Sequence, residues 1–231
     1  MAGLLLDLLA EGPRLIVSLP RNDPELARAA AEGGADALKV HLNVRHEASG
    51  TQFGGLEEER GALEEILGVG LPTGLVPGTG ERLASREEMR ELSEMGSDFF
   101  DMFARDMPAW MTSFEGMTRA AAVDADFPYT SLPELEALGI EMIEAAVVRP
   151  EGYGRPLCVA DLVAYGEIRR ATRLPIIVPT ERAIEPEEVP LLVGEIGVDA
   201  VMIGAVVTGR EARSLGAATE RFAAAVSAVR D

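Results

Sequence analysis

Lysine, histidine, cysteine and tryptophan are all scarce in this chain of 231 residues. The single cysteine, Cys158, excludes a disulfide within the chain, so we expect a protein of the reducing cytoplasm. No apolar run reaches the roughly 18 residues that a membrane-spanning helix needs. Residues 1–12 lack the basic start of a signal peptide and predict instead a short helix that covers one end of a domain.

Positive charge is also in short supply. The 39 acidic residues outnumber the 21 lysines and arginines, which gives a formal net charge of -18. Such a field repels nucleic acid and anionic membrane surfaces, so we expect neither as a partner. It also repels an anionic substrate at long range. Any phosphate site must therefore be local, built from backbone N–H groups with the help of a cation.

The basic residues are almost all arginine, and Lys39 is the only lysine. Both histidines, His41 and His46, lie close after it in the sequence. Arginine cannot lose its proton in proteins, so a lysine kept in an arginine-rich chain indicates a role that needs lysine. The alternative is that its position is due to chance.

Short apolar runs alternate with amphipathic stretches, the pattern of a parallel sheet with helical crossovers. Strands are predicted at Leu15–Leu19, Ala37–Asn43, Gly74–Pro77, Phe99–Ala104, Ala120–Asp124, Met142–Val148, Ile176–Pro179 and Val201–Ala205. Helices are predicted at Pro24–Ala31, Leu56–Leu67, Arg86–Met95, Leu132–Ala137, Val159–Thr172, Pro186–Glu195 and Glu211–Val229. Eight such units predict a single (β/α)8 TIM barrel domain over residues 1–231, with a short N-terminal helix. An open doubly wound sheet is the alternative, and the boundaries within 105–120 are unclear.

A repeated glycine and an acidic residue two positions later precede every second strand, at 34–37, 96–99, 139–142 and 197–200. The glycine suits a helix C-cap, and the acidic residue falls in the turn at the bottom of the barrel, where we expect a structural role. The repeat also sets a register. Five residues after each glycine, equal spacing places one inward layer that consists of Lys39, Asp101, Glu144 and Met202. Two positions later, nearer the C-terminal mouth, lie His41, Phe103, Ala146 and Gly204.

Charged residues are unusual inside a barrel, so Lys39, Asp101 and Glu144 should pair with one another. We interpret them, with His41, as candidate catalytic residues. A charged Lys39 would stabilise an enediolate-like anion, while Glu144, Asp101 or His41 carries the proton. The sequence therefore predicts an enzyme that acts on a small phosphorylated sugar or carbonyl metabolite by acid–base chemistry, as an isomerase, epimerase or lyase.

Two other functions stay open. Lys39 would serve a Schiff-base aldolase if its pKa were depressed, although neighbouring carboxylates favour the charged form. The cluster would be a structural ion-pair network in a non-catalytic barrel that binds a phosphorylated metabolite. A metal site built from His41, His46, Asp101 and Glu144 is a further alternative. Because the spacing of Lys39, His41 and His46 is not an established metal motif, we expect no metal, and we expect no other cofactor.

Residues at the other strand ends are candidates for binding the substrate and its phosphate, since barrels of this type often hold phosphate after the last two strands. Gly204 would let a ligand approach the backbone, and the following helix would offer free N–H groups. The predicted binding residues are Asn43, Arg45, Gly152, Glu181, Arg182, Gly204, Ala205 and Thr208. Asn43 is expected to face the barrel axis together with Lys39 and His41. Apolar helix faces in such barrels would also allow a homodimer.

Several stretches resemble the ribulose-phosphate-binding barrel group, and within it the N-acylmannosamine-6-phosphate 2-epimerases. They cover about a third of the chain and are Leu15–Ser18, Ala31–Ala35, Gly152–Tyr153, Pro175–Glu187 and Ala200–Thr208. The resemblance implies a barrel with a phosphate site. It also implies a catalytic lysine at the end of strand 3, where Leu75–Gly78 has none. The resemblance thus supports the fold and the phosphate site more than the epimerase reaction.

Overall fold

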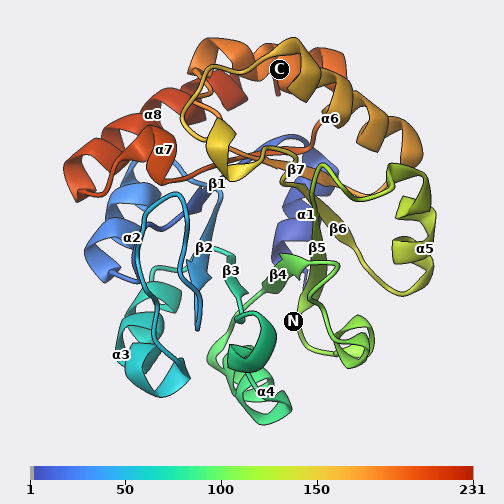
Figure 1. The fold of residues 1–231 in the computed structure, drawn as a ribbon. Coiled ribbons are helices and arrows are strands. Elements are labelled where there is room, and N and C mark those ends of the chain that lie inside the picture. The colour runs from blue at the N-terminus through green and yellow to red at the C-terminus, as the bar shows by residue number, and fades with distance from the viewer. Residues whose placement is uncertain (1–2, 231) are drawn as a thin grey trace.

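The sheet of this protein closes on itself. The structure, a computed structural model, describes residues 3–230. Within them eight parallel strands pair in chain order and β1 pairs with β8 (Figure 1). The strands are β1 (Arg14–Ser18), β2 (Ala37–His41), β3 (Thr73–Val76), β4 (Phe99–Phe103), β5 (Thr118–Val123), β6 (Met142–Ala145), β7 (Ile176–Pro179) and β8 (Ala200–Ile203). The closed (β/α)8 prediction is confirmed, and the open sheet is excluded.

Helices surround the barrel, as Figure 1 shows. The α-helices are α1 (Leu4–Glu11), α2 (Pro24–Glu32), α3 (Leu56–Leu67), α4 (Arg86–Met95), α5 (Leu132–Ala137), α6 (Val159–Ala171), α7 (Ala205–Thr208) and α8 (Ala212–Ser227). The unclear stretch after β4 holds a 3-10 helix, η2 (Ala109–Ser113). No helix within residues 3–230 has the length and apolar character to cross a bilayer.

Some predicted boundaries were wrong. Strands 2, 6 and 8 were predicted too long. The residues that follow them are buried after β6 and buried or half-buried after β2 and β8, and an apolar run alone does not separate a strand from the loop after it. The helix predicted at Pro186–Glu195 is instead a 3-10 turn, η5 (Pro186–Glu188), followed by a π-helix, η6 (Leu191–Ile196). Pro190 lies between them and has no N–H to continue a regular helix.

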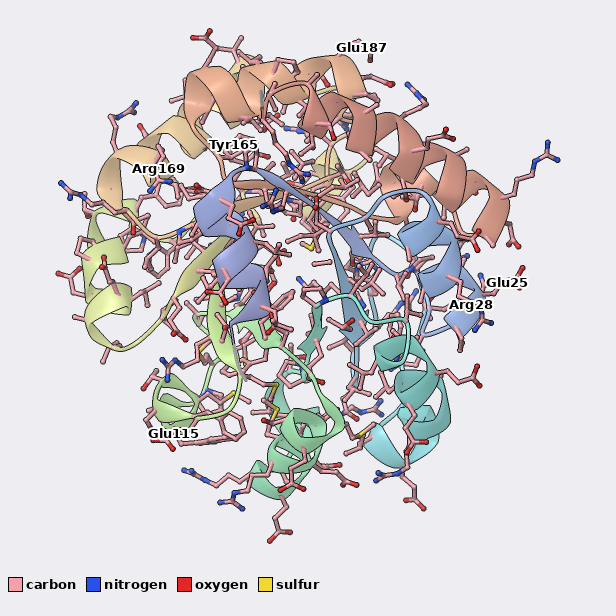
Figure 2. All side chains as sticks on the ribbon, turned by 180° about the vertical axis from the view of Figure 1, so that it is seen from behind. Glu25, Arg28, Glu115, Tyr165, Arg169 and Glu187 are labelled. Carbon is pink, nitrogen blue, oxygen red and sulfur yellow. The ribbon has the colours of Figure 1, made fainter. Side chains whose placement is uncertain are left out.

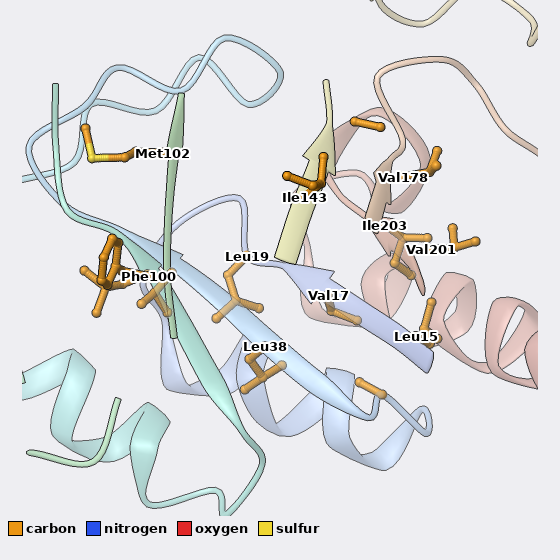
Figure 3. Close-up of a cluster of buried hydrophobic side chains, with 14 of the residues drawn as sticks. Leu15, Val17, Leu19, Leu38, Phe100, Met102, Ile143, Val178, Val201 and Ile203 are labelled. Carbon is orange, nitrogen blue, oxygen red and sulfur yellow. The ribbon is translucent and has the colours of Figure 1, made fainter. Parts of the chain in front are cut away.

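Two apolar layers hold the barrel together. Outward strand residues such as Leu15, Val17 and Ile203 pack under the helices (Figure 3). The inward residues at the bottom include Ile16, Phe99, Met142 and Ile177, and they pack against Leu5 and Leu9 of α1. Figure 2 shows α1 lying across this end of the barrel. The bottom is therefore closed by apolar packing, and access to the barrel axis is from the opposite end.

The acidic residues of the repeat fasten the bottom of the barrel. Asp36, Glu141 and Asp199 each accept a hydrogen bond from a backbone N–H at the start of the preceding strand or within it, at 2.8–3.1 Å. Asp98 instead accepts hydrogen bonds from the backbone N–H groups of residues 3–5, at 2.8–3.1 Å, and so caps α1. The predicted structural role of these residues is confirmed.

Candidate active site

The two inward layers predicted from the repeat meet at one cavity. Lys39, Asp101, Glu144 and Met202 line it, and the next layer, His41, Phe103, Ala146 and Gly204, lines it closer to the C-terminal mouth. We call this space the mouth cavity; its volume is about 260 Å³. Its size suits a small metabolite, since pockets for drug-sized ligands run from about 300 to 1,000 Å³.

An apolar floor lies beneath the charged layer. Lys39 pairs in register with Gly74 of β3, which has no side chain to fill the axis. The ring of Phe99 takes this space, because a Cβ on Gly74 would lie only 2.1 Å from it. The barrel is therefore solid below Lys39, and a ligand can reach the cluster only from the mouth.

Lys39, Asp101 and Glu144 form one buried ion cluster. The Lys39 Nζ donates to Asp101 Oδ2 at 2.5 Å and to Glu144 Oε2. All three residues are 8% exposed or less. The predicted pairing is thus confirmed, with one residue from each of β2, β4 and β6.

The pKa values define the protonation of this cluster. Burial opposes the charge on Lys39, but the two carboxylates outweigh it and raise the pKa of the amine. Burial and the charge of Asp101 raise the pKa of Glu144 well above its usual value. Burial also opposes charge on Asp101, yet Lys39 and a hydrogen bond with Glu144 lower the pKa of Asp101. The cluster therefore favours a lysine cation and an aspartate, and it holds a proton more readily on Glu144 than on Asp101.

A hairpin folds over the mouth after β2. Arg45 pairs with Gln52 across the hairpin, and the Arg210 guanidinium donates to Ser49 O and, at 3.3 Å, to Thr51 Oγ1. In Figure 1 the loop between β2 and α3 rises toward α7. The long loop of the sequence is thus an ordered cover, fastened to the segment after β8.

The hairpin places His46 on His41. Their ring centroids are 4.5 Å apart, and the ring of Phe53 lies 4.9 Å from that of His41. Burial, together with the nearby His46 and Lys39, holds the pKa of His41 well below its usual value. Burial and Lys39 lower the pKa of His46 to about 4. Both rings are neutral at pH 7, and Nδ1 of His41 has no hydrogen-bond partner within residues 3–230.

Glu181 is a third buried acid of the mouth cavity and lies outside the ion cluster. Its Oε1 accepts from the Tyr153 hydroxyl at 2.9 Å, and its Oε2 accepts from the Val148 N–H at 3.0 Å. Burial raises the pKa of Glu181 to about 7, against these hydrogen bonds and the cation of Lys39. A carboxyl that titrates near neutral pH suits proton transfer, whereas its charged form would repel a phosphate.

Arg45 and Gly204 also reach the mouth cavity, as predicted. A Cβ on Gly204 would touch only Ser18, at 3.6 Å, so the glycine leaves open space there. Sequence reasoning missed Ser18 and Thr180, which also line the cavity. The two-residue period of strand 1 was available to place Ser18, two positions after the inward Ile16.

Arg182 and Gly152 lie outside the walls of the mouth cavity and are hydrogen-bonded to each other. The Arg182 guanidinium donates to both carboxylate oxygens of Asp161, at 2.8 and 2.9 Å, and to Gly152 O at 2.9 Å. A Cβ on Gly152 would lie 2.8 Å from Arg182. These contacts tie the loops after β6 and β7 together, next to Glu181 in the chain.

Asn43, Ala205 and Thr208 are also outside the walls of the mouth cavity. The expectation that Asn43 faces the axis was wrong, because β2 ends at His41 and Asn43 has a φ of 58°, where the chain turns into the hairpin. Its side chain lines a separate surface cavity instead. Thr208 is buried and its hydroxyl donates to Gly209 O at 2.9 Å. Ala205 begins α7, directly after Gly204.

Within residues 3–230, no group of three or more His, Cys, Asp or Glu side chains has an arrangement that would hold a metal ion.

Solved structures share this architecture. No family model and no curated protein matches the sequence. A tryptophan synthase structure from Mycobacterium tuberculosis superposes with a TM-score of 0.77 at 16% identity, over 98% of this chain and 99% of that one. The chain therefore has the (β/α)8 fold.

Two further structures agree. KGPDC from Streptococcus mutans matches with a TM-score of 0.69 at 14% identity, over 94% of this chain and 98% of that one. The tryptophan synthase A-subunit of Pyrococcus furiosus matches with a TM-score of 0.70 at 15% identity, over 92% and 97% of the two chains. Identities this low show the fold alone, so the resemblance to the epimerase family stays a prediction.

Proposed function

We propose that this protein is an enzyme that moves a proton on a small phosphorylated sugar or carbonyl compound. The buried cluster of Lys39, Asp101 and Glu144 at the base of the mouth cavity carries the proposal. Burying three ionisable groups is costly, and apolar residues would fill a barrel at least as well. A cluster that closes the inward end of an open cavity is better explained by chemistry than by stability.

The cluster suits an enolisation. A base removes the proton next to the substrate carbonyl; the C–H electron pair forms a carbon–carbon double bond, and the carbonyl π pair moves to oxygen. The Lys39 cation and the acidic proton of Glu144 stabilise that oxygen as it becomes negative. We assign the base to Glu181, whose pKa of about 7 suits proton transfer at neutral pH.

Where the proton returns decides the product. Return to the same carbon from the opposite face gives an epimer, and return to the neighbouring carbon gives an isomer. In a lyase the base instead removes the proton of the hydroxyl on the β carbon, and the O–H pair forms the C=O of the leaving aldehyde or ketone. The pair of the broken carbon–carbon bond forms the double bond of the same enediolate, which then takes up a proton at carbon. All three reactions use the same oxyanion site. The residues therefore support this class of reaction, and experiment has to decide among the epimerase, the isomerase and the lyase.

The substrate phosphate is assigned to Arg45 and to the backbone around Gly204. Arg45 lines the mouth cavity and forms no ion pair within residues 3–230. The hairpin that carries it is fastened by Arg210 next to the end of α7. A local cation is needed because the net charge of -18 repels an anion at long range. Arg45 suits this role better than Lys39, whose amine is already held by two carboxyl groups.

The decisive experiment measures proton exchange in D2O. The protein is incubated with a panel of phosphorylated aldoses and ketoses, and NMR follows loss of the C–H signal next to the carbonyl. Wild type should exchange this proton with at least one compound, while Lys39→Met and Glu144→Gln should lose at least about 100-fold in rate. If no compound exchanges in wild type although some of them raise the thermal midpoint, the protein is a non-catalytic binding barrel.

A second measurement tests the phosphate assignment. Phosphorylated sugars, free sugars and inorganic phosphate are compared for their effect on the thermal midpoint. Gly204→Trp should abolish the stabilisation by phosphorylated compounds by filling the open side of the cavity. Gly61→Trp is the matched control, since Gly61 is exposed on α3 with nothing within 4 Å of a Cβ. If Gly204→Trp and Gly61→Trp changed the stabilisation by phosphorylated compounds equally, the phosphate assignment would be wrong.

The Schiff-base aldolase remains the second candidate because Lys39 lines the cavity. Its raised pKa opposes that reaction, since a nucleophilic amine has to be uncharged. Borohydride in the presence of the panel should leave Lys39 unmodified. A reduced adduct at Lys39, found by mass spectrometry, would establish the aldolase instead.

A further inference from the structure

A second cavity adjoins the mouth cavity above the C-terminal ends of β5 and β6. It has a volume of about 640 Å³ and is the larger of the two. The two share six wall residues, which are Glu47, Phe103, Ala122, Ala146, Tyr153 and Glu181. The two cavities therefore adjoin each other, and Ala122 and Ala146 lie at the junction. We call the second part the side cavity.

The strand residues at the junction are small. Ala122 is the inward residue at the end of β5 and Ala146 follows β6, and both are buried. Larger residues at these positions would close the barrel mouth, as branched side chains usually do. A ligand over Lys39 can therefore extend sideways between β5 and β6.

The side cavity has an apolar floor. Phe103, Val123, Phe127, Pro128 and Val148 line it. Val123 and Val148 are buried, and Phe127 is half-buried. Such a surface favours an apolar group of a ligand, because each Å² of apolar area removed from water contributes about 25 cal/mol.

The charges of the side cavity argue against a second anionic group. Its arginines are Arg105 and Arg149, and each is already paired with an aspartate: Arg105 with Asp124, and Arg149 with Asp126 at 2.5 Å. Glu47 adds a further negative charge at the junction. An anion there would have to displace these pairs and would meet the carboxylates, whereas an uncharged group meets neither cost.

We propose that the substrate has two parts: a phosphorylated carbonyl head over Lys39 and an uncharged, largely apolar group that occupies the side cavity. This inference rests on the proposed function for the head, and it adds the substrate class. A simple phosphorylated sugar fills only the mouth cavity. The full substrate carries a substituent of the size of a ring or a short acyl chain.

The test uses two separate probes in place of the whole substrate. Ribose 5-phosphate is the head probe, and benzamide, uncharged and flat, is the side-cavity probe. Saturation-transfer NMR measures binding of each, alone and together. The two probes should bind at the same time, and intermolecular NOEs should connect them because the two cavities adjoin each other.

Two variants with a matched control locate the benzamide. Phe127→Ala should weaken benzamide about tenfold and leave ribose 5-phosphate unchanged. Ala146→Leu should abolish the intermolecular NOEs by filling the junction. Ala160→Leu is the control, because Ala160 is exposed on α6 outside both cavities. Circular dichroism of each variant checks that the fold is kept.

The outcomes separate this inference from the proposed function. The side-cavity inference is overturned if the two probes compete with each other. It is also overturned if neither Phe127→Ala nor Ala146→Leu changes the binding of benzamide. Failure of benzamide to bind at all also overturns it. If benzamide binds at the Phe127-sensitive place and neither ribose 5-phosphate nor any other phosphorylated sugar binds, the side cavity stands as an apolar site and the proposed function falls.

Discussion

Lys39→Met should couple the stability of the protein to pH. Methionine matches the length of lysine but leaves Asp101 without its cation. A buried, unpaired carboxylate is costly, so the folded variant should bind one proton and keep the cluster neutral. The folded pKa of Asp101 then rises above its unfolded value of about 3.9. Stability due to this group is complete below that value and is lost as the pH rises through the folded pKa.

The size of the destabilisation follows from the extra proton that the folded Lys39→Met variant binds at Asp101. Each pH unit above 3.9 costs about 1.4 kcal/mol, so the variant should lose about 1.5 kcal/mol at pH 5 and about 4 kcal/mol at pH 7 relative to wild type. For a domain of this size 1 kcal/mol moves the midpoint by about 2–4 °C, which gives a fall of about 8–16 °C at pH 7.

The assay is thermal unfolding followed by circular dichroism from pH 5 to pH 8. Lys39→Met/Asp101→Asn is the matched control, because it removes the cation and the anion together. The double variant should recover most of the midpoint and lose the extra pH dependence. A single variant whose midpoint differs from wild type by the same few degrees at every pH would refute the assigned charges of the cluster.

Three further outcomes are expected. Glu181→Gln should flatten the fall in stability between pH 5 and pH 8. The pKa of Glu181 is raised to about 7, so the folded wild type loses roughly 3 kcal/mol as the pH rises from the usual carboxyl range through 7. Parallel curves of midpoint against pH for variant and wild type would contradict this. Asp98→Ala should cost about 2 kcal/mol and expose α1 to hydrogen exchange, measured at Leu5, while the strands keep their protection. Gly74→Ala should destabilise by about 1–3 kcal/mol through the clash with Phe99, and Phe99→Leu in the same chain should recover part of the loss in urea unfolding; additive losses would rule out the contact.

Much of the barrel could be predicted because its signals are local. Helices α3, α4 and α5 have the predicted bounds, since amphipathic period and caps are set by neighbouring residues. The equal spacing after the repeated glycines also placed Lys39 and Glu144 in one layer, since a strand alternates faces every two residues. The prediction that Asn43 faces the barrel axis was wrong because Asn43 itself has a left-handed backbone conformation and turns the chain away from the strand direction. The apolar pattern of the sequence contains no signal for such a turn.

The sequence by itself determined the closed barrel, the inward register and the charged cluster, because period, spacing and residue type are properties of the chain. Only the tertiary structure decided what each polar group is free to do. Arg182 and Arg45 are both arginines of the predicted site. The guanidinium of Arg182 is bound to Asp161, whereas Arg45 lines the mouth cavity. Burial raises the pKa of Glu181 to about 7, against the hydrogen bond from Tyr153 of a different loop. Hydrogen-bond partners and desolvation depend on segments far apart in the chain, so they arise only when the barrel closes.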